Sequence, residues 1–505
     1  MKTLRLTLLI VLSFLYGCEF DTVDGSNGGT SNAGFYAATG AALKKDPQYL
    51  GDAEKGRHTL LHGDYMSCGI PYKMWQNKLM QEFIALNFGG AAIKDPLPGR
   101  EGNNANVPYW LNVFTAENGA EVVNANCLLC HGSKFDGELI VGMPNSLADF
   151  TVDKLEIYSV PSLLLTLMGL NTAEQDQFNL LFSRIAAMGN ATQMRTVGMN
   201  PAEMLAVSLM VHHDRDTLEW FDEPLMPIVF KDHDGNLLRP GDETLTSDPP
   251  PWWRVKKKNA LFYNGMARGD HRGTMELATS VCVNDVERAG EVDKMFQDIQ
   301  AFINSIEAPK YKRHIDPDLA KLGEGIFNTD CAACHGTYGK TDKEDTYPNL
   351  LIPLEIIGTD AAVAEAGVVY GPEMVEWYNQ SFYGQVTRME PSEPFPGYMP
   401  PPLDGIWATA PFLHNGSVPT IELVLKSWKR PKYWRRQNLN NSYFDEEALG
   451  WPYVSLPYSW DDALLLEKKF IYDTTFLSQS NAGHTFGDHL TNDQRRAVIE
   501  YLKTL

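Results

Sequence analysis

The sequence predicts a mainly α-helical protein with two domains and long loops, preceded by an export signal and a flexible tether. Three observations support this prediction. The chain has 505 residues, which is too long for one ordinary core and comfortable for two domains. A motif of two cysteines and a histidine occurs twice, ending at His131 and His335. Apolar residues recur at helical spacing on both sides of a polar connector, residues 310–316.

The first 17 residues have the pattern of an export signal. Lys2 and Arg5 precede an apolar stretch, residues 6–16, that is too short to span a bilayer. Gly17-Cys18 follows and, with the two residues before it, resembles the bacterial lipoprotein cleavage box, in which the cysteine is lipidated. An ordinary cleaved signal is the alternative. We expect a lipid anchor at Cys18 that holds the chain on the periplasmic side, at the outer membrane or at the cell surface.

Residues 18–34 are predicted to be a tether. They are rich in Gly, Ser, Asn and Thr, a composition that cannot form a core. No later segment is predicted to cross a membrane, because the best candidate, Leu155–Leu170, is interrupted by polar residues and has the pattern of a buried helix.

The two cysteine motifs are Cys127-Leu128-Leu129-Cys130-His131 and Cys331-Ala332-Ala333-Cys334-His335. Cys-x-x-Cys-His is the attachment pattern of c-type haem, because two thiols reach two vinyl groups on one porphyrin edge while the adjacent imidazole binds iron. A redox dithiol or half of a zinc site is the alternative, but no further Cys-x-x-Cys pair is present to complete a zinc site. We expect two covalent haem c groups. A bound calcium ion has no legible sequence signal.

The remaining cysteines, Cys68 and Cys282, are even in number and belong to an exported chain. A disulfide between them and two free thiols are both open at this point.

The domain boundary is predicted at residues 309 and 310. Apolar residues between 292 and 306 recur at helical spacing, and Ala308-Pro309 ends that helix. Residues 35–309 would form an N-terminal haem domain and residues 310–505 a C-terminal one. In the second domain, one apolar-faced helix leads into Cys331, and a closing helix begins with a capping box at Thr491 and Gln494. These two helices resemble the crossing helices of the class I cytochrome c fold.

Residues 402–420 read PLDGIWATAPFLHNGSVPT. This segment resembles the "PxxHxGxxxT" signature of the di-haem cytochrome c peroxidase and MauG superfamily, and its fuller form is most similar to bacterial rubber oxygenases. The resemblance implies an exported di-haem oxidoreductase. One haem would bind peroxide or dioxygen, and the other would be fully ligated and pass or store electrons.

Axial ligands decide which iron reacts, because an open position admits a small oxidant. The peroxidase branch has a methionine ligand where this chain has Trp428, which cannot ligate. His484 resembles the distal histidine of the rubber-oxygenase branch and is the preferred second ligand of the His335 haem, with Met399 as the alternative. We expect His414, in the signature, to touch a haem edge rather than ligate.

The distal side of the His131 haem is harder to assign. We expect it to be open and to bind the oxidant, while Met143, His212, His213 and His271 are alternative ligands.

Trp252-Trp253 resembles the superfamily segment whose tryptophan lies between the two porphyrins. This resemblance implies that Trp253 relays electrons, and ordinary core packing is the alternative. No acid or base residue can be carried over from the peroxidases.

The predicted function is therefore an enzyme with His131 and Trp253 at its catalytic centre, a small oxidant and an unknown reductant or organic substrate as partners. A non-catalytic electron carrier on the membrane surface and a binding lipoprotein are the alternatives. The net charge of −21 argues against nucleic acid as a partner.

Overall fold

The computed structural model describes residues 37 and 39–505, except 49–50, 79–80, 83–95, 152–164, 166–167, 226–229, 232–236, 239–243, 342 and 391–394. The predicted signal, Cys18 and the tether lie outside the described residues, as does most of Leu155–Leu170. Within the described ranges, no helix is long and apolar enough to cross a membrane.

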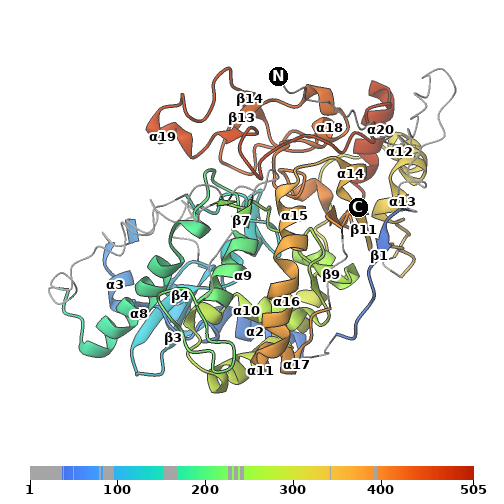
Figure 1. Ribbon diagram of the computed structural model, residues 1–505. Coiled ribbons are helices and arrows are strands. Elements are labelled where there is room, and N and C mark those ends of the chain that lie inside the picture. The colour runs from blue at the N-terminus through green and yellow to red at the C-terminus, as the bar shows by residue number, and fades with distance from the viewer. Residues whose placement is uncertain are drawn as a thin grey trace, which may run out of the picture.

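The described residues form a mixture of helix and sheet in which helices hold the larger share (Figure 1). The prediction of a mainly α-helical protein is therefore correct only in part. Small antiparallel sheets lie where several long loops were expected. The helices of eight or more residues are α2 (Ala53–His62), α8 (Thr172–Met188), α9 (Ala202–Val211), α11 (Val286–Ser305), α12 (Pro317–Asp330), α15 (Ala362–Val369), α16 (Gly371–Gln380) and α20 (Asn492–Leu502).

The three-stranded sheets have the orders β2-β4-β3, β1-β11-β12 and β14-β13-β15. Their strands are β2 (Ile70–Pro71), β4 (Glu121–Ala125), β3 (Leu111–Thr115), β1 (Ala41–Ala42), β11 (Leu350–Pro353), β12 (Gly397–Tyr398), β14 (Tyr453–Ser455), β13 (Tyr433–Arg436) and β15 (Tyr472–Asp473). The β3-β4 hairpin matters most for the site, because its second strand leads directly into Cys127.

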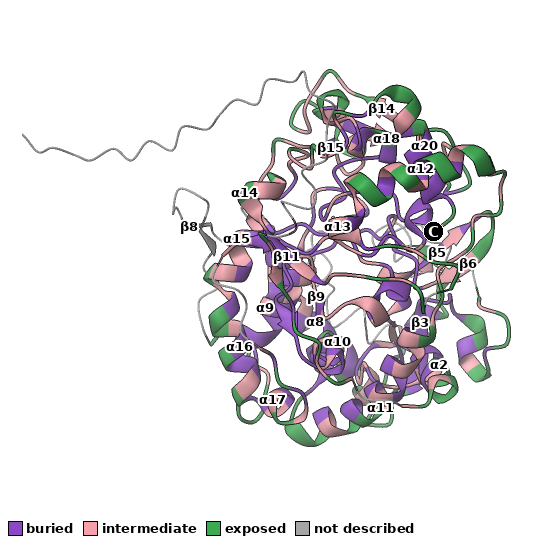
Figure 2. Ribbon diagram, turned by 90° about the vertical axis from the view of Figure 1, so that its right-hand side faces the viewer, coloured by how far each residue is buried: buried purple, intermediate pink, exposed green. Residues whose placement is uncertain are grey.

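The helices predicted around the second motif are confirmed. Asp316 caps α12, Pro317 opens it, and the predicted capping box of Thr491 and Gln494 begins α20. The two helices pack against each other at Gly323, where an added Cβ would lie 1.9 Å from the carbonyl oxygen of Ala497. Figure 2 shows this packing as an exposed outer face on α12 and a buried α20.

The N-terminal half has its own core around α11 and α2. The predicted apolar face of α11 packs with Leu60 of α2, and the cluster includes Trp252 and Leu128 of the first motif. Thus the helix that ends the first half also supports the first motif.

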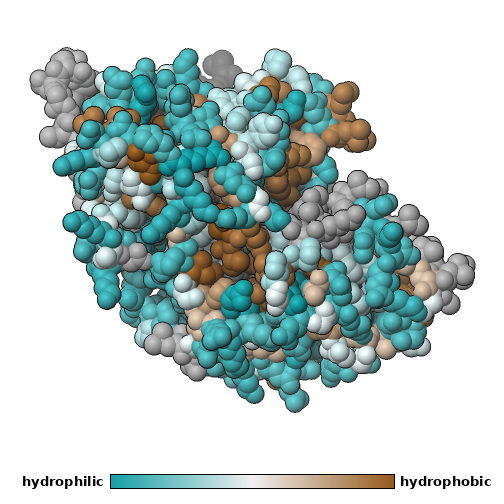
Figure 3. Space-filling model, turned by 180° about the vertical axis from the view of Figure 1, so that it is seen from behind, coloured by the Kyte–Doolittle hydropathy of each residue, from teal (hydrophilic) through white to brown (hydrophobic). Residues whose placement is uncertain are grey.

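Packing crosses the predicted boundary at residue 310. One core cluster joins Met143 and Trp253 to Phe327 and Leu403. Strand β1 pairs with β11, and α16 packs against α9. The boundary itself stays a prediction, but this shared core brings the segment after residue 248 beside the second motif. The surface seen from behind is mostly hydrophilic, with apolar side chains gathered near its middle (Figure 3).

Candidate haem sites

The second motif lies at the end of α12. A tight turn at Cys331 leads into α13 (Ala332–His335), so that Cys331, Cys334 and His335 all line one largely apolar cavity. The Nδ1 atom of His335 lies 2.8 Å from the carbonyl oxygen of Pro401. Because a carbonyl can only accept, Nδ1 donates and Nε2 keeps its lone pair for a metal.

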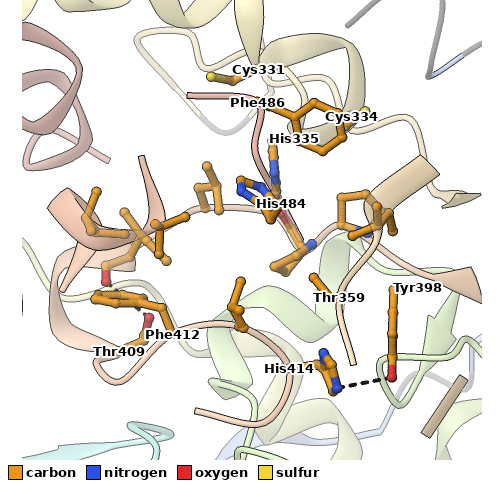
Figure 4. Close-up of a pocket in the computed structure, with 18 of the residues that line it drawn as sticks. Cys331, Cys334, His335, Thr359, Tyr398, Thr409, Phe412, His414, His484 and Phe486 are labelled. Atoms are coloured by element: carbon orange, nitrogen blue, oxygen red, sulfur yellow. Dashed lines mark hydrogen bonds between the residues drawn. The ribbon is translucent and has the colours of Figure 1, made fainter. Parts of the chain in front are cut away.

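His484 faces His335 across this cavity (Figure 4). An imidazole nitrogen binds a transition metal at about 2 Å and lies about 1 Å from its ring centre, so two axial imidazoles on one metal have centroids about 6 Å apart. The observed centroids of His335 and His484 are 6.3 Å apart. The pair therefore fits the two axial positions of a haem iron.

The loop around His484 is firmly held. Its backbone N–H donates to the carbonyl oxygen of Ile357 at 2.7 Å, and Arg430 donates to the carbonyls of Asn481, Gly483 and His484. Burial, together with the charges of His335 and Arg430, lowers the pKa of His484 to about 3. The imidazole is therefore neutral, which is the form that binds iron.

Met399 lines the same cavity, and its side chain packs with Leu43, Ala260 and Leu351. The alternative ligand is thus near the site, but the ring opposite His335 is that of His484. Trp428, in contrast, is 57% exposed and lies under the guanidinium of Arg495. The choice of His484 over Met399 stays a prediction that the geometry favours.

The first motif follows the β3-β4 hairpin and forms α5 (Leu128–His131). His131 repeats the arrangement of His335, because its Nδ1 atom lies 3.1 Å from the carbonyl oxygen of Pro250. The ring that packs against His131 is that of Trp252, with centroids 4.9 Å apart. An indole has no lone pair to offer iron, so this contact orients the imidazole without competing for the metal.

The thiols of the two cysteine pairs are buried among groups that disfavour the thiolate. Burial raises the pKa of Cys127 and Cys334 to about 11, and that of Cys130 and Cys331 to about 12. A reactive dithiol needs a lowered pKa. Within the described ranges, no group of three or more His, Cys, Asp or Glu side chains is arranged to hold a metal ion. Two free thiols beside an available imidazole fit haem attachment at both motifs.

Of the two possibilities left open for Cys68 and Cys282, the structure has the disulfide, with Cα atoms 5.3 Å apart. It joins the turn before β2 to the turn before α11 and is fully buried.

The alternative ligands of the first haem have other contacts. Nδ1 of His212 lies 2.7 Å from the carbonyl oxygen of Phe221, and both ring nitrogens of His213 contact backbone carbonyls. His271 is buried in α10 (His271–Leu277), and Met143 packs in the core cluster of Trp253. These contacts match packing roles for His212 and His213.

Trp253 packs in one core cluster with Phe135 and Met143, which follow the first motif, and with Ala332 of the second motif. Its side chain is 1% exposed, and its Nε1 donates to the carbonyl oxygen of Asp404 at 2.7 Å. Arg254 Nε donates to the same oxygen at 2.9 Å. Gly405 packs on the indole, and an added Cβ there would lie 2.9 Å from Nε1. The segment that holds His131 is thus joined to the segment that holds His335.

His414 is buried under Tyr398, with ring centroids 4.1 Å apart and Nε2 3.0 Å from the tyrosine hydroxyl. It lines the cavity of the second motif, which agrees with the expected contact with a haem edge. His489, on the surface, pairs with Asp330.

Sequence reasoning missed Pro250 and Pro401, whose carbonyls accept from the two proximal imidazoles. A signal was present: Pro249–Pro251 and Pro400–Pro402 are the same triple proline. The unequal distances from the motifs hide this repeat.

Residues 397–435 match a family model described as RoxA-like, cytochrome c-like. The segment is similar to RoxA-like cytochromes c. It contains the signature segment, His414 and the carbonyls of Pro401 and Asp404, and the match supports a haem c cofactor and a cytochrome c relationship. The relationship to di-haem peroxidases and MauG stays a prediction.

Two curated proteins of Sinorhizobium fredii (strain NBRC 101917 / NGR234) are similar to parts of the chain. Uncharacterized protein y4iJ is 31% identical over an alignment of 248 residues, and the match covers 38% of this chain and 39% of that protein. Uncharacterized protein y4iM is 27% identical over an alignment of 148 residues, and the match covers 27% of this chain and 34% of that protein. The chain thus spans well under half the length of these relatives.

Proposed function

We propose that this chain is an exported di-haem c-type oxidoreductase that activates dioxygen or peroxide at the haem of His131 and uses the haem of His335 as its electron partner. The observation that carries the proposal is the asymmetry of the two sites. The ring centroids of His335 and His484 are 6.3 Å apart, whereas no ring contact among the described residues pairs His131 with a second imidazole, and its stacked neighbour is the indole of Trp252. An iron with two strong protein ligands transfers electrons, and one with an open position binds a small oxidant.

The prolyl carbonyls bear on the type of chemistry. A carboxylate that accepts the Nδ1–H of a proximal histidine raises its basicity more than a neutral carbonyl does. Here Pro250 and Pro401 supply neutral carbonyls. This arrangement gives little extra electron density for cleaving a peroxide bond, and it supports dioxygen as the oxidant over efficient peroxide turnover.

Trp253 supplies the connection between the sites. From the carbonyl of Pro250 the chain runs through Trp252 to Trp253, whose indole N–H donates to Asp404. Asp404 lies three residues after Pro401, the partner of His335. The route consists of residues 250–253 and 401–404, the hydrogen bond between Trp253 and Asp404, and the hydrogen bonds from the two imidazoles to Pro250 and Pro401. It would carry an electron between the haems.

Export is proposed on the disulfide as well as on the predicted signal. Disulfides persist in oxidising compartments and are rare in the cytosol. The buried bond between Cys68 and Cys282 therefore supports a periplasmic or surface location, with membrane contact through the lipid at Cys18.

Spin-state counting tests the proposal. The oxidised protein should show one low-spin and one ligand-exchangeable haem, and cyanide or imidazole should bind at one haem. In the Trp253→Phe variant, ligand binding should persist while the accompanying change at the other haem slows. Trp407→Phe is the matched control, because Trp407 is a second buried tryptophan of the same core whose Nε1 donates to a carbonyl, that of Pro309.

If both haems are low-spin and inert to small ligands, also after reduction of one of them, the catalytic proposal is wrong. A membrane-anchored electron carrier would then be the function.

A further inference from the structure

Polar side chains gather at one end of the cavity that contains His335 and His484. Figure 4 shows the two cysteines at one end, and Thr359, Tyr398 and His414 toward the other. Arg254, Tyr263 and Asp248 also line this cavity, whose remaining lining is largely apolar.

Arg254 is the cation of this group. It is 5% exposed, and its Nε donates to the carbonyl of Asp404, while Nη2 lies 3.5 Å from the hydroxyl of Thr409. No carboxylate of the described residues lies within ion-pair distance of it. Burial lowers its pKa, which shows the cost of holding the guanidinium there. A buried cation is stable only beside a compensating anion.

The neighbouring groups also lack an acceptor. The Thr359 hydroxyl is buried and makes no hydrogen bond within the described part of the chain. The Tyr263 hydroxyl has no hydrogen-bond partner among these residues either. Oδ1 of Asp248 is unpaired, and burial raises the pKa of this carboxyl well above its usual range. A guanidinium and the two hydroxyl donors of Tyr263 and Thr359 together favour an anionic acceptor.

We propose that this polar end binds the propionate carboxylates of the haem attached at Cys331 and Cys334, with Arg254 as their cationic partner. The two vinyl groups and the two propionates of a haem lie on opposite sides of the ring. Attachment at the cysteine end therefore directs the propionates toward Arg254, Tyr263 and Thr359. The inference rests on the proposed function only for the presence of this haem, and it makes no use of the oxidant.

Redox titration of the low-spin haem in Arg254→Gln tests the proposal. Loss of one positive charge favours the oxidised haem, and a charge about 10 Å away at an effective dielectric near 20 changes the equilibrium about tenfold. For one electron this lowers the midpoint potential by about 59 mV. The propionate bending band in the resonance Raman spectrum of Arg254→Gln should move as well. Arg254→Lys should restore most of the midpoint potential, because the charge is kept. It should not restore the band, because an ammonium cannot form a bidentate pair with a carboxylate.

Arg184→Gln is the matched control, because Arg184 is 4% exposed and donates to the carbonyls of Val281 and Val283, away from the cavity. In the Arg184→Gln protein, the midpoint potential of the low-spin haem and the propionate band should stay unchanged. Intact mass reports whether both haems are attached. If the Gln variant does not take up haem, Arg254→Lys decides through the Raman band. An unmoved propionate band in a variant with two haems, or an equal shift in Arg184→Gln, overturns the proposal.

Discussion

Replacing His484 with alanine should convert one of the two haems from low-spin to high-spin. The 6.3 Å between the ring centroids of His335 and His484 leaves room for one iron and no other ligand between them. Removing the second imidazole takes the iron from two strong protein ligands to one, which is a five-coordinate, high-spin arrangement. One haem per molecule should change from low-spin to high-spin. Added imidazole should restore the low-spin signal, because the deleted side chain leaves a space in which imidazole fits.

Paramagnetic resonance with spin quantitation is the assay, and Met399→Leu is the control. Met399 is 2% exposed in an apolar cluster, and a swap of similar volume costs under about 1.5 kcal/mol. Its spectrum should match that of the wild type. A low-spin signal that survives in His484→Ala and disappears in Met399→Leu would refute the reasoning and make Met399 the ligand.

Three further predictions follow. Cys130→Ser should remove only the first haem and Cys334→Ser only the second, as intact mass will show; a wild-type mass with one haem or none would end the two-haem prediction. Gly405→Ala should destabilise the fold by about 1–3 kcal/mol, because its φ is +59° and the new Cβ would lie 2.9 Å from Trp253 Nε1; Gly325→Ala, in an open part of α12, should not destabilise in the same denaturant titration. Burial lowers the pKa of His414 to about 3 from 6.5, so between these values the unfolded chain binds a proton that the folded chain does not. The free energy of unfolding should therefore fall as the pH falls through this window, by up to about 1.4 kcal/mol per pH unit. The His414→Gln protein should lose this pH dependence, and an unchanged slope would contradict the lowered pKa of His414.

The sequence was sufficient where a local pattern has a single physical solution. Helix α12 followed from apolar spacing that leads into Cys331, and α20 followed from a capping box at Thr491, and both helices are present at these places. The even number of remaining cysteines allowed a disulfide between Cys68 and Cys282 but could not decide between it and two free thiols, and the structure contains the bond. The small sheets were not foreseen, since strands of two to five residues carry too few side chains for an alternating pattern to stand out.

The partners of the proximal histidines could not be predicted for a different reason. A backbone carbonyl accepts a hydrogen bond whatever side chain its residue carries, so the chemistry of Pro250 and Pro401 leaves no residue type to recognise. Proline suits these two positions because of its backbone. Its fixed φ favours an extended chain beside the imidazole, and it has no backbone N–H that would need a hydrogen-bond acceptor in this buried place. The same triple proline at 249–251 and 400–402 therefore acts as a repeated support for two imidazoles. Trp253 and Arg254 follow the first triplet and both donate to the carbonyl oxygen of Asp404 after the second, so this single oxygen joins the two supports.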